Sequence, residues 1–203
     1  DGKLPAVIAP FDAELFGHWW YEGPRWLVHA IRWMHFDPDL QVMTGSQYVR
    51  RHEPTAAITL PEGSWGVNAT HEVWLNPGLE WIWRRIYDAE ADFQALLRDH
   101  GPGHDDSMRA LVQQAARELL LLQASDWPFL ITTGTAADYA AQRLVGHHED
   151  YKRVAELARR YGRRETLSDE DWAWLGQLQE RDRPFPAADP THFGAIRHPA
   201  LTD

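Results

Sequence analysis

The chain has 203 residues, of which 44% are hydrophobic and 25% are charged, a composition typical of a soluble globular protein with one large or two small domains. The absence of cysteine excludes disulfides, thiolate metal sites and cysteine nucleophiles, and the net charge of −10 disfavours nucleic acid and anionic membranes as partners. No apolar run reaches the roughly 18–20 residues of a membrane-spanning helix, and the start of the chain resembles neither a signal peptide nor an initiating segment.

The first predicted element is a short buried strand over Leu4–Phe11, where apolar residues follow one another without alternation. Gly17 and Gly23 break the next segment into a loop, and Pro24 begins a helix that Asp37-Pro38-Asp39 ends. A strand, a loop and a helix in this order indicate a βα unit. In barrels and open parallel sheets, catalytic residues collect where a strand passes into its loop.

Residues 40–77 are punctuated by glycine and proline, which predicts long loops. Four helices are predicted beyond them from 3.6-residue periodicity: one after the cap Asn76, one after Gly101-Pro102-Gly103, one from near Thr135 and one after the cap Ser168. The proline-rich tail from Arg183 is expected to lie over the surface.

The predicted fold is therefore α/β plus all-α. Residues 1–77 would form the end of a catalytic (β/α) barrel with its active-site loops, and residues 78–203 a helical C-terminal domain. A lone βα unit cannot bury both faces of its strand, so we expect the neighbouring strands to come from a part of the protein outside this chain.

Asp12 and Glu14 follow the apolar strand directly. In extended backbone the two side chains point the same way, and their Cα atoms are roughly 6–7 Å apart. An acid beside aromatic residues can have its pKa raised by desolvation, as a proton donor requires. Alternatively, one of these acids pairs with an arginine or caps the loop.

Eleven tryptophans are many for this length; most should pack in the core, Trp81, Trp83, Trp172 and Trp174 among them. Trp65, between Gly63 and Gly66, is placed where a bulky ring would face a ligand. Asp126 is placed where it could cap a helix ahead of Pro128. His147 falls on an apolar helical stripe and is interpreted as structural, and no zinc or calcium ligand spacing is present, so no metal or other cofactor is predicted.

Four segments carry a specific resemblance. "APFDAELFGHWWYEGPRWL" and "LPEGSWGVNATHEVWLN" resemble the fourth and fifth signature regions of glycoside hydrolase family 57 in its 1,4-α-glucan branching enzymes. "RELLLLQASDWPFL" and "RDRPFPAADP" resemble the helical C-terminal domain of the same enzymes. The match is collinear over nearly the whole chain. It departs at Thr70-His71, where the family often has an acid before the histidine.

The resemblance implies the C-terminal portion of a seven-stranded (β/α) barrel enzyme that works by a retaining mechanism with two carboxylates. By position in the motif, Asp12 is the general acid/base. Trp65 and Trp74 become stacking platforms for glucose rings, and Asp126 a sugar-binding or supporting acid. His18, Trp19 and Trp20 either shape the wall beside Asp12 or pack under it.

The resemblance further implies an α-glucan substrate, a cytoplasmic role in storage-glucan synthesis, and a nucleophilic glutamate upstream of this chain. The partner would be the N-terminal catalytic half of the same enzyme, without which the chain should be inactive. Two alternatives remain: a family 57 4-α-glucanotransferase or amylase, and a non-catalytic glucan-binding helical module.

Overall fold

The computed structural model describes residues 5–186 and 188–194. The chain divides into two compact units, residues 1–61 and 62–203, which are described separately. Within the described ranges the regular structure is helical, and no strand is present. The predicted division at 77/78 falls inside the second unit, because residues 62–77 contact the helices that follow them.

The first unit contains two helices, α1 (Gly23–Phe36) and α2 (Gly45–Arg51), preceded by an irregular turn, η1 (Leu15–Trp19). The predicted helix beginning at Pro24 is confirmed. The predicted strand over Leu4–Phe11 is wrong for the described residues 5–11, which form no ladder. An isolated extended segment has no neighbouring backbone to bond, so it cannot form a strand by itself.

Helix α2 was not predicted. It begins with a capping box in which the Thr44 hydroxyl accepts a hydrogen bond from the Gln47 amide at 3.2 Å, and the Gln47 side chain accepts one from the Thr44 amide at 2.9 Å. Residues 53–61 follow α2 as an exposed segment without helix or strand.

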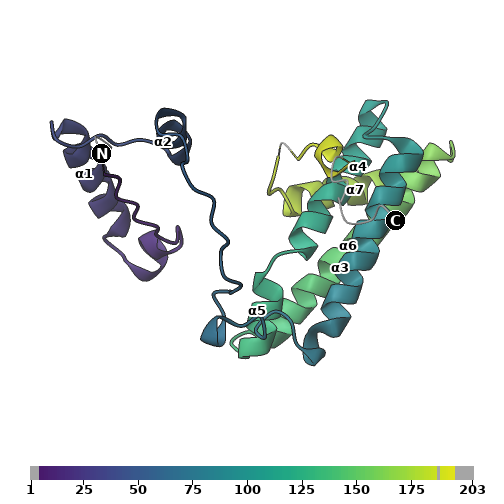
Figure 1. The fold of residues 1–203 in the computed structure, drawn as a ribbon. Coiled ribbons are helices and arrows are strands. Elements are labelled where there is room, and N and C mark those ends of the chain that lie inside the picture. The colour runs from purple at the N-terminus through teal and green to yellow at the C-terminus, as the bar shows by residue number, and fades with distance from the viewer. Residues whose placement is uncertain (1–4, 187, 195–203) are drawn as a thin grey trace. The chain divides into compact units, whose positions relative to one another are not determined.

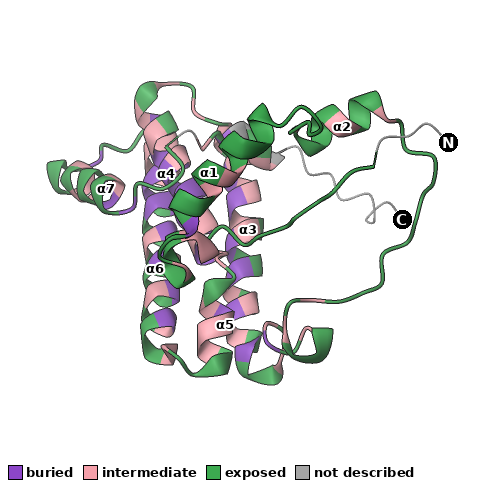
Figure 2. Cartoon of the chain, turned by 90° about the vertical axis from the view of Figure 1, so that its left-hand side faces the viewer, coloured by how far each residue is buried: buried purple, intermediate pink, exposed green. Residues whose placement is uncertain are grey.

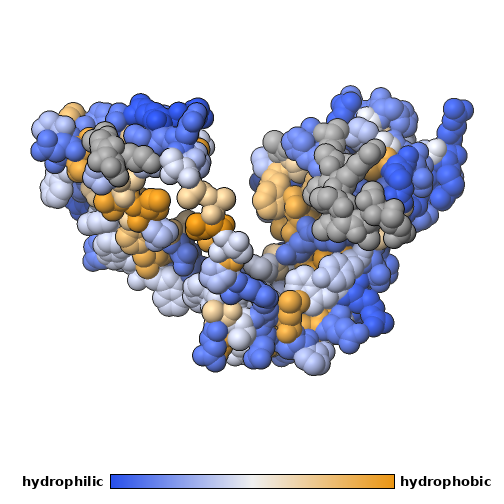
Figure 3. Space-filling view, in the orientation of Figure 1, coloured by the Kyte–Doolittle hydropathy of each residue, from blue (hydrophilic) through white to orange (hydrophobic). Residues whose placement is uncertain are grey.

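Helix α1 has much of its apolar surface in solvent. Ile31, Trp33 and Phe36 are 45%, 76% and 77% exposed, and Val7 and Ile8 before the helix are 95% and 85% exposed. Figure 2 shows that α1 is almost entirely exposed, and Figure 3 shows apolar side chains on the surface of this unit. Monomeric proteins rarely leave such a set uncovered, so the unit fits a protein that has more structure around this helix.

In its described residues the second unit is a bundle of five helices: α3 (Glu80–His100), α4 (Asp106–Leu122), α5 (Asp126–Thr133), α6 (Ala137–Gly162) and α7 (Asp169–Arg181) (Figure 1). Short 3₁₀ turns flank them: η2 (Val67–Ala69), η3 (Pro77–Leu79) and η4 (Pro190–Gly194). Buried residues lie on the facing sides of α3, α4 and α6 (Figure 2). This core includes Ile82, Phe93, Leu111, Ala115, Leu144, Tyr151 and Val154.

The sequence periodicity explains this core. The helix predicted from near Thr135 is α6, and its apolar stripe is buried from Ala140 to Ala158. His147 lies among the apolar members of this stripe. The caps are confirmed too: Asn76 accepts from the Gly78 amide at 3.0 Å, and Ser168 forms a capping box with Asp171. The helical half of the predicted fold class is therefore confirmed, whereas the barrel strands are not observed in the described residues.

The described part of the tail after α7, up to residue 194, returns to the bundle, as predicted. Phe193 in η4 meets Phe93 of α3 edge to face, with ring centroids 5.3 Å apart, and its carbonyl accepts a hydrogen bond from the Gln94 side chain at 2.5 Å. The tail thereby covers one face of α3 and α4. No described helix is long and apolar enough to cross a bilayer.

Candidate functional site

Asp12 lies in the first unit, at the point where the extended N-terminal segment turns into η1. Its carbonyl accepts from the Leu15 amide at 3.1 Å, which closes the turn. Gly17, at φ 97°, provides the left-handed residue that this turn needs. The Asp12 carboxylate is exposed and, among the described residues, makes no hydrogen bond or ion pair. It is therefore unpaired and open to solvent.

The three aromatic residues after Gly17 have different environments. Trp20 is half-buried, with its ring 5.0 Å from Trp26 and tightly packed over Gly23, where an added Cβ would come within 3.1 Å of the indole. Trp19 is 72% exposed, and its Nε1 donates to Glu14 Oε1 at 3.2 Å. His18, also exposed, meets Trp19 edge to face. Trp20 thus packs beneath the loop, while His18 and Trp19 remain available at the surface.

Trp65 and Trp74 lie in the second unit, and both rings are near the same phenylalanine. Each ring centroid is 6.0 Å from that of Phe129 on α5. Trp65 is 77% exposed, whereas Trp74 is half-buried. We call Trp65, Trp74 and Phe129 the aromatic platform. Phe129 was not singled out from the sequence, although it belongs to the matched segment "RELLLLQASDWPFL".

Hydrogen bonds fix the loop that carries the platform. Trp74 Nε1 donates to the Ser125 carbonyl at 3.1 Å, and the Trp74 carbonyl accepts from Trp83 Nε1 at 2.7 Å. Gly66 is needed for close packing, since a Cβ there would lie 3.0 Å from the Trp74 ring and 2.8 Å from the Thr70 carbonyl. The platform is consequently held in place before any ligand arrives.

Asp126 is the first residue of α5, next to the carbonyl that binds Trp74. Its interpretation as a helix cap is wrong, because Ser125 occupies the cap position and no side chain caps this helix. The Asp126 carboxylate is exposed and has no hydrogen-bond partner among the described residues. Three predicted binding residues, Trp65, Trp74 and Asp126, therefore gather around the N-terminal end of α5.

A buried polar network lies behind α5, and sequence reasoning missed it. Glu118 of α4 is fully buried; it accepts from Gln114 Nε2 at 2.7 Å and from His147 Nδ1 at 2.8 Å. Burial raises the pKa of the Glu118 carboxyl, against the opposing hydrogen bond from His147. The Trp127 ring of α5 stacks on His147 at 6.2 Å and 28°, which ties α5 to the network.

Ligand atoms of Glu118, His147 and Asp182 lie within 4.8 Å of one another, close enough to hold a metal ion. Each of these residues already has a protein partner: Glu118 accepts from Gln114 and His147, Arg143 Nη2 donates to His147 Nε2 at 2.9 Å, and Arg181 Nε donates to Asp182 at 3.0 Å. Because an arginine does not give up its proton, Nε2 of His147 must accept and Nδ1 carries the hydrogen. The charges are balanced internally, so we interpret the cluster as structural.

Residues 85–193 match the family model described as the C-terminal part of 1,4-alpha-glucan branching enzyme. The chain belongs to this family. It is similar to the 1,4-alpha-glucan branching enzyme of Thermococcus kodakarensis, with 40% identity over 185 residues that make up 91% of this chain and 27% of that enzyme. The resemblance to the branching enzymes of family 57 is confirmed.

Solved structures agree with this assignment. The crystal structure of the GH57-type branching enzyme from Pyrococcus horikoshii is similar with a TM-score of 0.74 and 38% identity, over 97% of this chain and 36% of that one. The alpha-amylase AmyC from Thermotoga maritima is similar with a TM-score of 0.61 and 29% identity, over 95% of this chain and 34% of the amylase. The chain thus spans about a quarter to a third of the length of these relatives.

Proposed function

We propose that this chain is the C-terminal part of a retaining 1,4-α-glucan branching enzyme, which cleaves α-1,4 links and forms α-1,6 branches in glycogen-like glucans. The observation that carries the proposal is the match of residues 85–193 to the C-terminal branching-enzyme family, together with a partly exposed aromatic platform and an unpaired carboxylate, Asp126, in the same unit.

Asp12 is the proposed general acid/base. In a retaining mechanism one carboxyl protonates the departing glycosidic oxygen, and a second carboxylate attacks the sugar and forms a covalent intermediate. Asp12 then takes the proton from the acceptor, which in branching is the 6-hydroxyl of another glucan chain. The nucleophile is a glutamate of the upstream catalytic half, so the chain by itself should not turn over substrate.

The aromatic platform is the proposed contact for glucose rings. Indole and phenyl faces stack on the apolar faces of sugars, and Asp126 can accept hydrogen bonds from sugar hydroxyls. Rings packed against a bound glucan also exclude water, which favours a sugar acceptor over hydrolysis. His18 and Trp19 are proposed to contribute to the wall beside Asp12, with Trp20 as their support.

The proposed partner is the N-terminal catalytic half of the same enzyme. The exposed apolar side chains of α1 and the unpaired segment before η1 support it, since both would be covered if they joined a larger barrel. The boundary between barrel end and helical domain at 77/78 belongs to this proposal, as does a cytoplasmic role in glycogen synthesis.

The test uses the whole enzyme that contains this chain, incubated with amylose while α-1,6 links and new reducing ends are counted. We expect branches to form with few reducing ends. Asp12→Asn should lower turnover by about 10²–10⁴-fold, because the departing oxygen loses its proton donor. Asp39→Asn, which removes another exposed acid of the first unit, is the control and should leave turnover unchanged.

Two outcomes would contradict the proposal in different ways. Abundant reducing sugar without branches would favour an amylase, a candidate supported by the similarity to the alpha-amylase AmyC. Unchanged turnover in Asp12→Asn would remove Asp12 from the chemistry and favour a non-catalytic glucan-binding role for the chain.

A further inference from the structure

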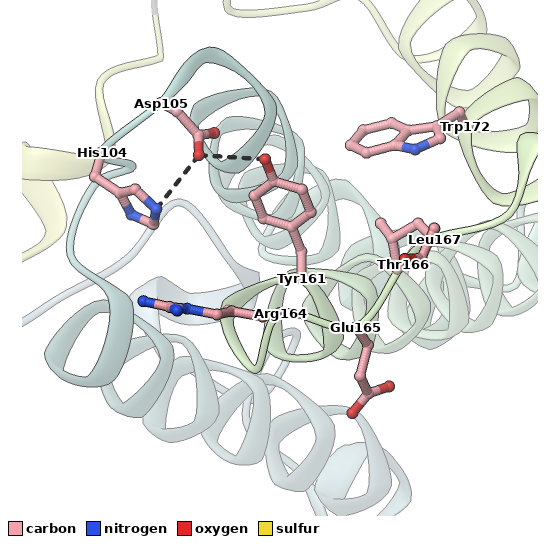
Figure 4. Close-up of a pocket in the computed structure, with 9 residues that line it drawn as sticks. His104, Asp105, Tyr161, Arg164, Glu165, Thr166, Leu167 and Trp172 are labelled. Atoms are coloured by element: carbon pink, nitrogen blue, oxygen red, sulfur yellow. Dashed lines mark hydrogen bonds and ion pairs between the residues drawn. The ribbon is translucent and has the colours of Figure 1, made fainter.

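A cavity of about 550 Å³ lies in the second unit, and none of its lining residues belongs to α5. It is formed by the N-terminal end of α4, the C-terminal end of α6 and the start of α7. Figure 4 shows Tyr161 and Trp172 facing it from two different helices. Their ring centroids are 6.1 Å apart and their planes are at 82°, so the two half-buried rings form adjoining walls of a corner. A cavity of this size is in the range of small-molecule sites.

The acids at this cavity are already bonded. Asp105 accepts from the Met108 amide at 2.8 Å and from the Tyr161 hydroxyl at 3.2 Å (Figure 4). Glu165 is paired with Arg163 at 2.7 Å and with Arg160 at 3.4 Å. Neither carboxylate is therefore free to attract a cation into the cavity.

The unpaired polar groups are a guanidinium, which donates, and a hydroxyl, which can donate or accept. The side chains of Arg164 and Thr166 line the cavity and, among the described residues, have no hydrogen-bond or ion-pair partner. Two acids and one arginine line the cavity. The lining therefore has no excess of positive charge, and nothing in it would select an anion. Aromatic walls combined with unpaired donors suit a neutral ligand rich in hydroxyl groups.

Arg164 is held in a conformation that its side chain does not favour. Its φ is 63°, in the left-handed region, where glycine is the usual residue. The Arg164 amide bonds the Tyr161 carbonyl and the Glu165 amide bonds the Arg160 carbonyl, which is the Schellman pattern at the end of α6. Glycine would serve this helix end better, so the arginine is placed here at some expense of stability, as is found at functional positions.

We propose that this cavity is a second α-glucan-binding site, in which a glucose ring stacks on Trp172 or Tyr161 and its hydroxyls bond Arg164 and Thr166. The inference rests on the proposed function for its ligand class. A branched or linear glucan is long enough to contact two places on one protein. A second contact at the cavity raises the apparent affinity for the polymer without changing the affinity of the aromatic platform for glucose rings. The expected role is to retain polymeric substrate between turnovers.

The test is affinity electrophoresis of the full chain in gels that contain amylopectin, from which an apparent dissociation constant is obtained. Arg164→Gly should raise this constant about tenfold, yet raise or preserve the midpoint of thermal unfolding, because glycine relieves the left-handed strain. If Arg164 had a structural role only, Arg164→Gly would migrate through the amylopectin gel like the wild type, with an unchanged dissociation constant.

Trp172 offers a matched pair with Trp174 on the same helix. Both rings are half-buried against the core, but Trp174 is covered by the Arg153 guanidinium at 3.9 Å and does not line the cavity. Trp172→Leu should weaken retardation like Arg164→Gly, whereas Trp174→Leu should leave it unchanged. Equal effects of both tryptophan variants would overturn the proposal, since the loss would then reflect the fold.

Trp65→Ala separates this inference from the proposed function. If it abolishes retardation while Arg164→Gly and Trp172→Leu match the wild type, the cavity does not bind glucan and the aromatic platform still does. If the wild-type chain shows no retardation at all, glucan binding itself fails, and the cavity proposal fails with it. Partial loss in each variant, and greater loss on combination, is the result we expect.

Discussion

Replacing Glu118 with alanine is the sharpest test of the buried network. The side chain is fully buried, and both of its oxygens are used: Gln114 donates to one at 2.7 Å and His147 to the other at 2.8 Å. Glu118→Ala leaves these two donors buried without an acceptor. It also removes the carboxylate beside Arg117, whose guanidinium is itself buried.

The expected loss follows from these contacts. Removing one member of a buried, hydrogen-bonded charged set typically costs about 3–5 kcal/mol, because the remaining polar groups keep their desolvation penalty. For a helical unit of this size each kcal/mol lowers the midpoint of thermal unfolding by roughly 3–4 °C. We therefore expect Glu118→Ala to unfold roughly 10–20 °C below the wild type.

Far-UV circular dichroism during heating measures the midpoint, and urea titration gives the free energy of unfolding with a check on its slope. Glu149→Ala is the matched control: this glutamate of α6 is 61% exposed and lies 3.4 Å from Lys152, a surface pair worth under about 1 kcal/mol. If Glu118→Ala were as stable as Glu149→Ala, the network would not contribute to the stability of the bundle.

Three further predictions concern stability. Burial raises the pKa of Glu118 above its ordinary value of 4.5, so the part of its stabilisation that depends on the bound proton is complete below that value and is lost as pH rises through the raised pKa. The hydrogen bonds from Gln114 and His147 remain, and the stability advantage of wild type over Glu118→Gln should therefore shrink, but not vanish, in urea titrations as pH increases above about 4.5. Gly103 has a φ of 108°, and a Cβ added there would lie 2.5 Å from the Arg109 Cα, whereas a Cβ added at Gly101 would meet no atom. Gly103→Ala should therefore destabilise the protein clearly more than Gly101→Ala, which should cost about 1 kcal/mol, and equal urea midpoints would contradict this. Ser168→Ala should cost about 1 kcal/mol through the lost cap of α7, whereas no change in the thermal midpoint would mean that the capping box is not formed in solution.

The helical bundle could be predicted because its signals are local. The stripe through Leu144 and Tyr151 repeats at helical spacing, and Ser168 stands three residues before an acid, so periodicity and capping both identify the helices. Helix α2 was missed because Gly45 was interpreted as a loop residue, although Thr44 and Gln47 form a recognisable capping box.

The strand and the buried network depend on distant parts of a protein, which local patterns do not contain. An apolar run such as residues 5–11 becomes a strand only beside other strands, and the described residues offer none. Glu118 is a charged residue in a helix, which predicts exposure, and its partner His147 is 29 residues away. His147 itself was placed correctly on the buried stripe, but nothing in the spacing pointed to its acid.

The residues proposed for binding could be singled out from the sequence only in part. Trp65 stood out by its position between two glycines, while the roles of Trp74 and Asp126 came from the family resemblance. Phe129, whose ring lies 6.0 Å from each of the two tryptophan rings, has no distinguishing spacing in the sequence. Stacking partners from separate segments can be recognised only once the chain is folded.

The exposed stretch 53–61, which has neither helix nor strand, has an evolutionary implication. The entire core, its caps and the aromatic platform follow this stretch in the chain, whereas Asp12 precedes it. Recombination or insertion at such a stretch would not divide a hydrophobic core. An exchange of sequence at this stretch would therefore leave the packing of the bundle intact.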